Sequence, residues 1–398
     1  MMLVLLACLS LAALAVLIEL AARVWIRARG TYYVFPPGQR LRLAIDLETL
    51  PELQPAVRHD ANSDGERGPE VPRVGRGERL YRVLVAGGSQ PEGYFLDQDA
   101  TWPGALQHIL STPDHLQRLG ASKAHVGSVA RSGVGSEALD TILARVLPRY
   151  GRLSAIVILV GASDVLRWLE EGAPARPSSR VPVDELFACH PEGPFGWTPG
   201  ALASVELARR ARLRIQRPEQ VHTRTGRWIG MARAMRARAK VIHATMPDPG
   251  PMLAHFEKHL HRVIERARAH AGRVVLVRQS WYGKEPLTAE ELAHMWHGGV
   301  GQAWREEVTT YYSVEVTARL MALLDASAAR VARALDVDQI DLMSVLDPNL
   351  STYYDFFHLT SFGARTVADA VARTLLRQHA ETAARAGELP TCADLRAS

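Results

Sequence analysis

An aspartate, a histidine and a serine of this sequence have side chains that can pass a proton from one to the next. Asp355 stands three residues before His358 in the stretch Asp-Phe-Phe-His-Leu-Thr. This spacing places both side chains on the same side of a helical turn, so the carboxylate can hold one imidazole nitrogen while the other faces outward. Ser89 follows a hydrophobic run that ends in two glycines. A serine at a tight strand-to-helix turn is exposed at the sheet edge, where a free imidazole nitrogen can activate it, so the pattern predicts a serine hydrolase.

The elements that must position these residues are short apolar runs that alternate with helical stretches. The run 155–160, Ala-Ile-Val-Ile-Leu-Val, is typical of a strand buried on both faces. Repeated strand-helix units indicate a parallel sheet covered by helices, with a ligand site beyond the carboxyl ends of the strands. We therefore predict an α/β fold, a flavodoxin-like three-layer α/β/α sandwich with a mostly parallel five-stranded sheet. Strands are expected at 81–86, 125–130, 155–160, 274–277 and 339–342, and helices at 101–110, 251–270 and 313–335.

Four sequence blocks at these strand ends resemble the SGNH (GDSL-like) hydrolase superfamily. They are Ala-Gly-Gly-Ser-Gln-Pro-Glu-Gly at 86–93 with Thr-Trp-Pro at 101–103, Arg-Ser-Gly-Val-Gly-Ser at 131–136, Val-Gly-Ala-Ser-Asp at 160–164, and Asp-Phe-Phe-His at 355–358 with Gly363 following. The stretch 62–69, Asn-Ser-Asp-Gly-Glu-Arg-Gly-Pro, also resembles the lead-in segment of membrane-anchored members. The likeness covers residues 60–375, except for 166–240, which match no part of the family pattern.

The resemblance implies a role for each matching residue. Ser89 would be the nucleophile, His358 the general base and Asp355 the residue that orients the imidazole. The backbone N–H groups of Ser89 and Gly133 would stabilise the oxyanion. A third donor is normally an asparagine of the third block, but Ser163 occupies that position here. Losing one oxyanion donor typically costs about 3 kcal/mol of transition-state stabilisation. The family's chemistry needs no cofactor and no metal.

The same residues also have purely structural interpretations. Gly88-Ser89 is a common turn and helix cap, and Asp355 with His358 is a possible capping pair before the last helix. Gly133 suits a tight turn as well as an oxyanion hole, and Asp164 is expected to be a turn or cap residue. The ordered combination of the four blocks favours the catalytic interpretation.

The first 22 residues are almost wholly apolar, and Arg23, Arg27 and Arg29 follow them. Their length and the interfacial Trp25 predict a single N-terminal membrane anchor. A cleaved signal peptide is the alternative, although no basic residue precedes the apolar run. The arginines favour a cytoplasmic catalytic domain by the positive-inside rule, whereas family analogy favours an extracytoplasmic one.

These patterns predict four segments. Residues 1–29 form the anchor, and 30–79 form a juxtamembrane extension without a strand or helix period, loosely packed on the domain. The hydrolase domain is expected at 80–376, with an insertion at about 166–240, and 377–398 form a C-terminal tail.

Composition limits the partners. A net charge of +5 over 398 residues is mild, and the basic stretch 209–238 is best explained as a solvated helical face near anionic lipid, so no nucleic acid is expected. The scattered cysteines at 8, 189 and 392 exclude a paired-cysteine zinc cluster. A disulfide between Cys189 and Cys392 remains an alternative if the domain lies outside the cytoplasm. Residues His294, Trp296 and His297, and Cys189-His190, lack recognised metal-ligand spacing and are expected to line a substrate cleft.

Together these features predict a membrane-anchored serine esterase that removes an acetyl or short acyl ester from a glycan or lipid. An acyltransferase of the same fold is the first alternative. The second is a catalytically silent, membrane-anchored carbohydrate-binding or assembly protein, which Ser163 favours.

Overall fold

The centre of the molecule is a five-stranded sheet in which every neighbouring pair of strands is parallel. The computed structural model describes residues 2–29, 32–177, 181–188, 202–216 and 219–387. The strand order is β10-β8-β5-β3-β4, which is the flavodoxin-like order and confirms the predicted fold class. The strands are β3 (Leu80–Gly87), β4 (Lys123–Ser128), β5 (Ala155–Leu159), β8 (Val274–Arg278) and β10 (Asp338–Asp341).

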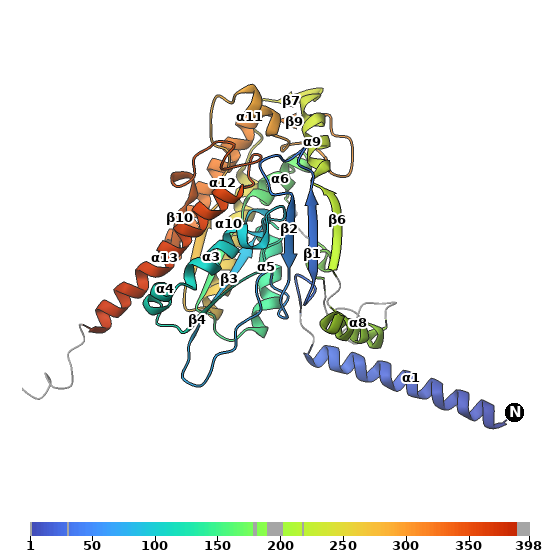
Figure 1. Cartoon of the computed structure of the whole chain (residues 1–398). Coiled ribbons are helices and arrows are strands. Elements are labelled where there is room, and N and C mark those ends of the chain that lie inside the picture. The colour runs from blue at the N-terminus through green and yellow to red at the C-terminus, as the bar shows by residue number, and fades with distance from the viewer. Residues whose placement is uncertain (1, 30–31, 178–180, 189–201, 217–218, 388–398) are drawn as a thin grey trace, which may run out of the picture.

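Helices cover both faces of this sheet. One face carries α3 (Trp102–Leu110) and α13 (Ser361–Gly387), which pack against each other (Figure 1). The other carries α5 (Ser136–Val146), α10 (Gly250–His270) and α12 (Val314–Ala334), with α10 packed between its two neighbours. Right-handed crossovers explain this division, because the chain moves toward one edge from β3 to β4 and back toward the other edge afterwards.

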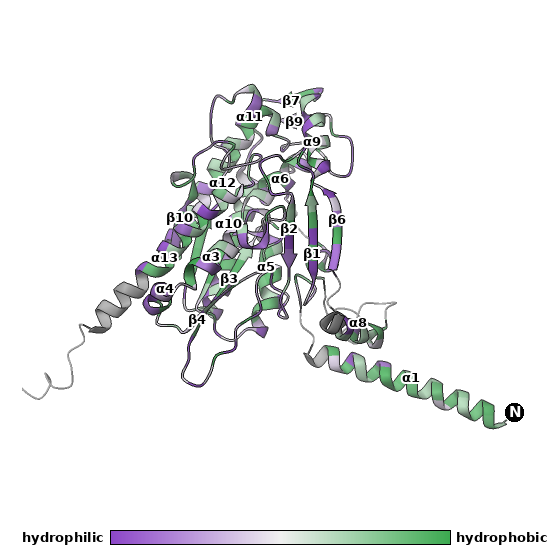
Figure 2. Ribbon diagram, in the orientation of Figure 1, coloured by the Kyte–Doolittle hydropathy of each residue, from purple (hydrophilic) through white to green (hydrophobic). Residues whose placement is uncertain are grey.

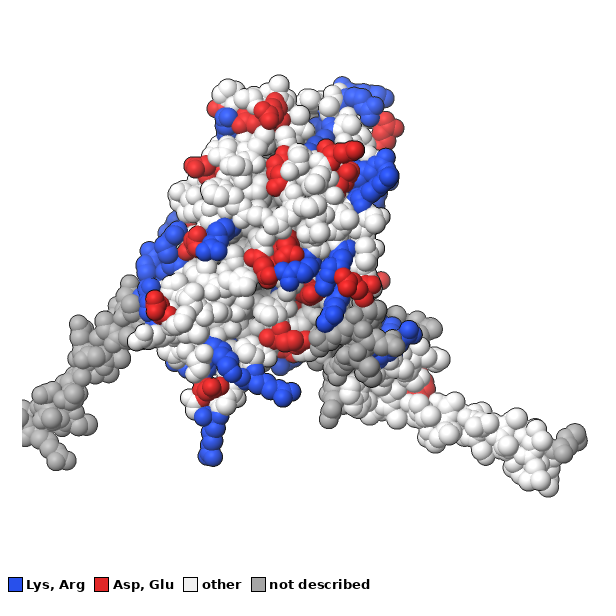
Figure 3. Space-filling model, in the orientation of Figure 1, with Lys and Arg blue, Asp and Glu red and all other residues white. Residues whose placement is uncertain are grey.

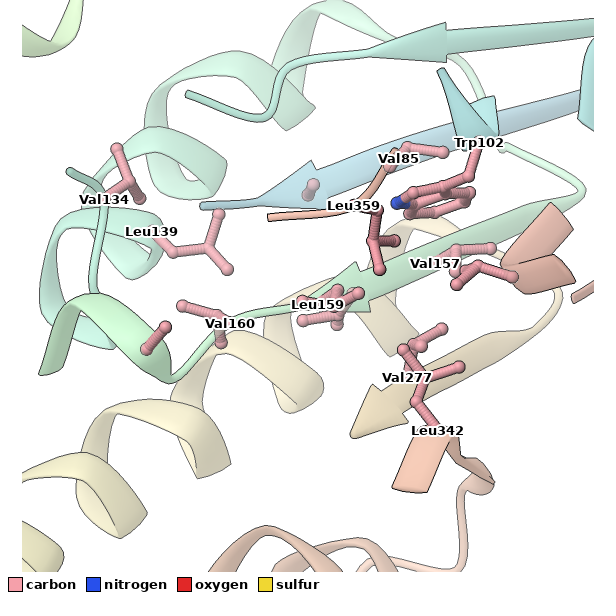
Figure 4. Close-up of a cluster of buried hydrophobic side chains, with 14 of the residues drawn as sticks. Val85, Trp102, Val134, Leu139, Val157, Leu159, Val160, Val277, Leu342 and Leu359 are labelled. Carbon is pink, nitrogen blue, oxygen red and sulfur yellow. The ribbon is translucent and has the colours of Figure 1, made fainter. Parts of the chain in front are cut away.

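The core lies between the sheet and these two helix layers. All five residues of β5 are buried, as the continuous apolar run predicts for a central parallel strand. Figure 4 shows part of this core, to which α3 contributes Trp102 and α5 contributes Leu139, both fully buried.

The order of the strands also fixes where a ligand site can form. The connections leaving β3 and β5 run to opposite sides of the sheet, so a crevice opens beyond their carboxyl ends. Ser89 follows β3 directly, and the block 160–164 follows β5. Both therefore lie at this crevice.

Two strands between residues 40 and 60 belong to a second sheet, so the prediction that 30–79 is a loosely packed segment without strands is wrong. Strands β1 (Arg40–Ile45) and β2 (Ala56–Asp60) pair antiparallel, and β6 (Glu219–Thr225) pairs parallel with β1. The alternation of β1, in which Leu41, Leu43 and Ile45 are buried, has the period of a half-buried strand but spans only six residues. Because β6 belongs to the stretch 166–240, the two segments outside the main sheet pair with each other.

The remaining elements are short and lie around this framework. Strands β7 (Val241–His243) and β9 (Thr310–Tyr312) form a two-stranded parallel pair. The other helices are α2 (Ser89–Glu92), α4 (Pro113–Arg118), α6 (Ala162–Glu170), α7 (Val183–Leu186), α8 (Ala203–Gln216), α9 (Arg227–Ala237) and α11 (Ala289–His294), and the 3₁₀ turns are Gln98–Ala100, Leu147–Arg149 and Leu342–Ser344.

Helix α1 (Met2–Arg29) projects from the rest of the chain (Figure 1) and is hydrophobic along most of its length (Figure 2). Its segment Met2–Ile26 is long and apolar enough to cross a membrane, with a mean hydropathy of 2.7, a property that a signal sequence shares. Glu19, the one acidic residue of this run, accepts hydrogen bonds from the backbone N–H groups of Ala203 and Ser204 at 2.9 and 3.0 Å. The carboxylate therefore caps the start of α8, which lies alongside α1.

The basic stretch 209–238 is only partly a solvated face. Arg236 is buried and donates to the carbonyl oxygens of His297 and Tyr312. Arg233 donates to the carbonyl oxygens of Thr49 and Tyr354 at 2.6 and 2.7 Å. Both guanidinium groups therefore hold loops of the domain together, and the expectation of a solvated face is wrong for them. Figure 3 shows basic and acidic side chains interspersed over the face in view.

Candidate active site

The turn after β3 brings Ser89 close to the end of β5. The backbone N–H of Gly88 donates to the carbonyl oxygen of Leu159 at 3.1 Å. A Cβ on Gly87 would lie 1.9 Å from the same oxygen, so only glycine permits this approach. Ser89 is half-buried and begins α2, so its backbone N–H has no intrahelical partner.

The structure brings the three predicted triad residues into one hydrogen-bonded series. The distance from Nε2 of His358 to Oγ of Ser89 is 2.8 Å. The other ring nitrogen, Nδ1, lies 2.8 Å from Oδ2 and 3.0 Å from Oδ1 of Asp355. A hydroxyl, an imidazole and a carboxylate are thus in contact in the order that nucleophile activation requires.

The local structure that joins Asp355 to His358 is a bend and not the expected helical turn. Oδ1 of Asp355 accepts the backbone N–H groups of Phe357 and His358 at 2.9 and 2.8 Å. Aspartate side chains commonly form such bonds to the backbone two or three residues ahead. The contact between Asp355 and His358 therefore arises because hydrogen bonds from the backbone to the carboxylate close a bend.

Asp355 also receives a hydrogen bond from a residue whose role the sequence did not indicate. Nε1 of Trp296 donates to Oδ2 of Asp355 at 2.9 Å, and Asp355 is fully buried. Burial raises the pKa of Asp355, but the charge interaction with His358 and the hydrogen bonds to the carboxylate outweigh burial and hold this pKa well below its usual range. The carboxylate therefore stays ionised and can stabilise an imidazolium.

Replacing Trp296 by phenylalanine tests this positioning role. Hydrogen bonds to charged groups contribute about 1.5–3 kcal/mol, so we expect kcat for an ester substrate to fall by roughly 10- to 100-fold with KM unchanged. Steady-state kinetics separate the two parameters. Trp304→Phe, at an exposed tryptophan, is the matched control, and an equal loss in both variants would contradict the role.

Two aromatic rings fix the orientation of the imidazole. Tyr354 stacks on His358 with ring centres 5.5 Å apart and planes inclined by 10°. His297 lies 5.8 Å from the same ring, and burial lowers its pKa to about 3, so it is neutral. Ligand atoms of His297, Asp355 and His358 also lie within 4.8 Å of one another. A cation bound there would take the atoms that now form the hydrogen bond between His358 and Asp355, so the triad and a metal site exclude each other.

The predicted oxyanion residues lie on loops around the same turn. Gly133 has a φ of +75° in the loop after β4, which favours glycine, and this loop contacts the nucleophile turn through Arg131 N–H and Gly87 O at 3.1 Å. Ser163 is in the first turn of α6, with Oγ 3.8 Å from where a Cβ of Gly88 would stand. Both residues therefore flank the turn that carries Ser89.

Asp164, the neighbour of Ser163, has a capping role. Its carboxylate accepts the backbone N–H of Ser136 at 2.9 Å and the hydroxyl of Ser136 at 2.6 Å, at the start of α5. Burial raises the pKa of Asp164 to about 6. Asp164 thus ties α5 to α6.

Two buried charged residues, Arg67 and Glu92, hold the loops behind Ser89. Arg67 donates to the carbonyl oxygens of Glu92, Gly93 and Leu96. Glu92 accepts the backbone N–H of Ser132 at 2.7 Å, next to Gly133. Both residues lie in blocks that carry the family resemblance, at 62–69 and 86–93, although spacing alone did not predict their contacts.

The structure describes three of the residues that the sequence placed in a substrate cleft. His294 pairs with Glu52 at 2.9 Å, whereas Trp296 and His297 lie beside Asp355 and His358, as described above. Cys189, His190 and Cys392 lie outside the described residues.

No family model matches the sequence, and no curated protein matches it. The fold is similar to that of several solved structures. A lipolytic protein of the G-D-S-L family from Veillonella parvula is 9% identical, with 74% of this chain and 97% of that chain covered and a TM-score of 0.39. The acetylxylan esterase Axe2 from Geobacillus stearothermophilus is 11% identical, with 75% and 94% covered and a TM-score of 0.38. LAE5, an alpha/beta hydrolase enzyme from the metagenome of Lake Arreo, Spain, is 13% identical, with 75% and 96% covered and a TM-score of 0.39.

Proposed function

We propose that this protein is a serine esterase that transfers an acyl group to Ser89 and then releases it to water. The observation that carries the proposal is the unbroken series from Ser89 Oγ through His358 to Asp355, with 2.8 Å at each step. A serine hydroxyl is a weak nucleophile unless an adjacent base removes its proton. The series supplies that base and holds it in one orientation.

In the first step, Ser89 Oγ attacks the ester carbonyl while Nε2 of His358 takes the hydroxyl proton. Asp355 accepts the N–H at Nδ1 and stabilises the imidazolium that forms. His358 then gives the proton to the leaving alkoxide, and the bond between carbonyl carbon and leaving oxygen breaks. Water then attacks the carbonyl carbon of the acyl-enzyme while Nε2 of His358 again takes the proton. The bond between this carbon and Ser89 Oγ breaks, His358 returns the proton to Oγ, and the carboxylic acid leaves.

The oxyanion of each tetrahedral intermediate needs hydrogen-bond donors. The backbone N–H of Ser89 at the start of α2 and that of Gly133 on the adjoining loop are the proposed donors. Their positions are supported by the tight turn at Gly87 and by the contact between Glu92 and the loop that carries Gly133. Ser163 would be the third donor.

Ser163 is shorter than asparagine and donates one hydrogen bond, so it is the feature that favours a catalytically silent protein. We expect Ser163→Asn to raise kcat for p-nitrophenyl acetate by up to roughly 10²-fold, because an amide N–H would reach the oxyanion directly. Steady-state hydrolysis measures the effect. Ser111→Asn, at an exposed serine after α3, is the control, and an unchanged or lower rate in Ser163→Asn would remove Ser163 from the oxyanion hole.

The proposed substrate is an acetyl or short acyl ester of a glycan or lipid, reached by a domain that α1 anchors at a membrane. Support for the anchor comes from the apolar segment Met2–Ile26, and the extracytoplasmic side is the proposed location of the domain. A reporter enzyme fused at the C-terminus, active on only one side of the membrane, tests the location. Reporter activity in the cytoplasm would contradict it.

Hydrolysis of p-nitrophenyl esters of increasing acyl length tests the proposed activity. We expect turnover with acetate and butyrate to exceed that with long-chain esters, and Ser89→Ala to abolish turnover of all of them. Adding a sugar acceptor and measuring acylated sugar distinguishes transfer from hydrolysis. Turnover that is equal in wild type and Ser89→Ala would contradict the esterase proposal.

A further inference from the structure

A second cluster of ionisable side chains lies between α5 and α10, apart from Ser89 and its partners. His255 and His259 are four residues apart on α10, and Glu137 is in the first turn of α5. Ligand atoms of these three residues all lie within 4.8 Å of one another. Residues four apart on a helix face the same way, so the two imidazoles point together toward α5.

The distances within this cluster suit a small divalent cation. Nε2 of His255 lies 3.4 Å from Oε2 of Glu137, and the two imidazole centres are 4.6 Å apart. Ligand atoms bound to tetrahedral zinc at about 2.0–2.1 Å are about 3.4 Å from one another. The pair His255 and Glu137 already has this separation, and only a small movement of His259 is needed to complete it.

His259 is a buried histidine of the cluster with a ring nitrogen that lacks a hydrogen-bond partner among the described residues. It is 6% exposed, and its Nδ1 has no hydrogen-bond partner in the part of the chain that the structure describes. Oδ2 of Asp140 lies 4.0 Å from this nitrogen. An imidazole that binds a metal through one nitrogen commonly directs the other toward a carboxylate, and Asp140 is placed to be that partner.

The cluster is reached from the surface through a pocket of about 510 Å³, lined by Glu137, Asp140, Val181, Val183, His259 and Arg262. Arg262 is exposed, so its charge is screened by solvent. Two imidazoles with carboxylates favour zinc, cobalt or nickel, whereas magnesium and calcium prefer oxygen ligands alone.

We propose that His255, His259 and Glu137 form a binding site for a divalent transition-metal ion such as Zn²⁺, with water as the fourth ligand. The ion joins α5 to α10. Because Glu137 follows Gly133 by four residues, the ion also fixes the start of the helix that leads away from the proposed oxyanion loop. The site is structural and takes no part in acyl transfer.

Titration of the purified full-length protein in detergent with Co²⁺ tests this site, because tetrahedral Co²⁺ absorbs visible light. We expect saturable binding with one ion per chain, displaced by Zn²⁺, and weakened at least ~10²-fold in both His255→Ala and Glu137→Gln. His261→Ala is the matched control, since His261 is an exposed histidine on the same helix, and it must bind as wild type does. His358→Ala must also bind Co²⁺, which separates this site from the cluster around Asp355.

Thermal unfolding gives a second readout that does not depend on colour. Zn²⁺ at 100 times the wild-type Kd is expected to raise the Tm of wild type and His261→Ala by several degrees, and to raise that of His255→Ala and Glu137→Gln by no more than roughly a sixth as much. Equal Co²⁺ binding by wild type and both ligand variants would overturn the proposal. So would loss of binding in His358→Ala, or the lack of saturable binding in wild type.

Discussion

Replacing His358 by alanine is expected to lower kcat for p-nitrophenyl acetate by roughly 10⁴-fold or more, with little change in KM. The imidazole of His358 joins Ser89 to Asp355, with 2.8 Å to each. Without the imidazole, Ser89 has no base to take its proton, and the leaving group has no acid. Because His358 is not needed to hold the ester in the ground state, binding should be retained.

His108→Ala is the matched control for this experiment. His108 is an exposed histidine on α3, so its removal should leave both kinetic parameters unchanged. Thermal unfolding of the two variants shows whether either substitution affects the fold. A His358→Ala protein that keeps more than a tenth of wild-type kcat would show that another group is the base.

Replacing Asp355 by asparagine is expected to lower kcat by roughly 10³- to 10⁴-fold. The carboxylate accepts hydrogen bonds from Trp296 Nε1, from two backbone N–H groups and from His358 Nδ1. An amide has one oxygen and one NH₂ group. The NH₂ group cannot accept hydrogen bonds, so it would face N–H groups that now donate to Asp355 and would break those bonds. His358 would then turn its unprotonated nitrogen toward the amide and lose the tautomer in which Nε2 is the base.

The same substitution has a predictable effect on stability. The pKa of Asp355 is lower in the folded chain than in an unfolded one, so the ionised carboxylate stabilises the fold above about pH 4. This contribution is lost as the pH falls further. Denaturant unfolding of wild type and Asp355→Asn should therefore differ more at pH 7 than at pH 3, whereas Asp369→Asn, at a partly exposed position of α13, should match wild type. A difference independent of pH would contradict the depressed pKa.

The main sheet could be predicted because its strands are short, apolar and separated by long helices. The run 155–160 became the buried strand β5, and the expected order of strands and helices gave the parallel sheet. Strand β1 was missed because its apolar alternation spans only six residues, and β2 was missed because its only apolar residues are the first two of five. Pairing of β1 with β6, about 180 residues away in the chain, depends on long-range contacts that local pattern does not contain.

At the site, the spacing of Asp355 and His358 predicted their contact, but for the wrong local structure. A bend closed by the carboxylate gives the same separation as a helical turn, and both patterns look alike in sequence. Trp296 was predicted only as a cleft residue. Its hydrogen bond to Asp355 could not be predicted, because the two residues are far apart in the sequence. Arg233 and Arg236 were similarly hidden within a basic stretch, because burial of individual arginines depends on the carbonyl groups that the fold turns toward them.

Labelling with a fluorophosphonate probe is the most direct measurement of nucleophile activation. The probe reacts with a serine only when a neighbouring base activates its hydroxyl, and mass spectrometry of the digested protein locates the adduct. We predict one adduct, on the peptide that contains Ser89, in wild type and in Ser111→Ala, and none at that peptide in Ser89→Ala or His358→Ala. Folded wild-type protein that remains unlabelled, or that is labelled equally in His358→Ala, would contradict the account.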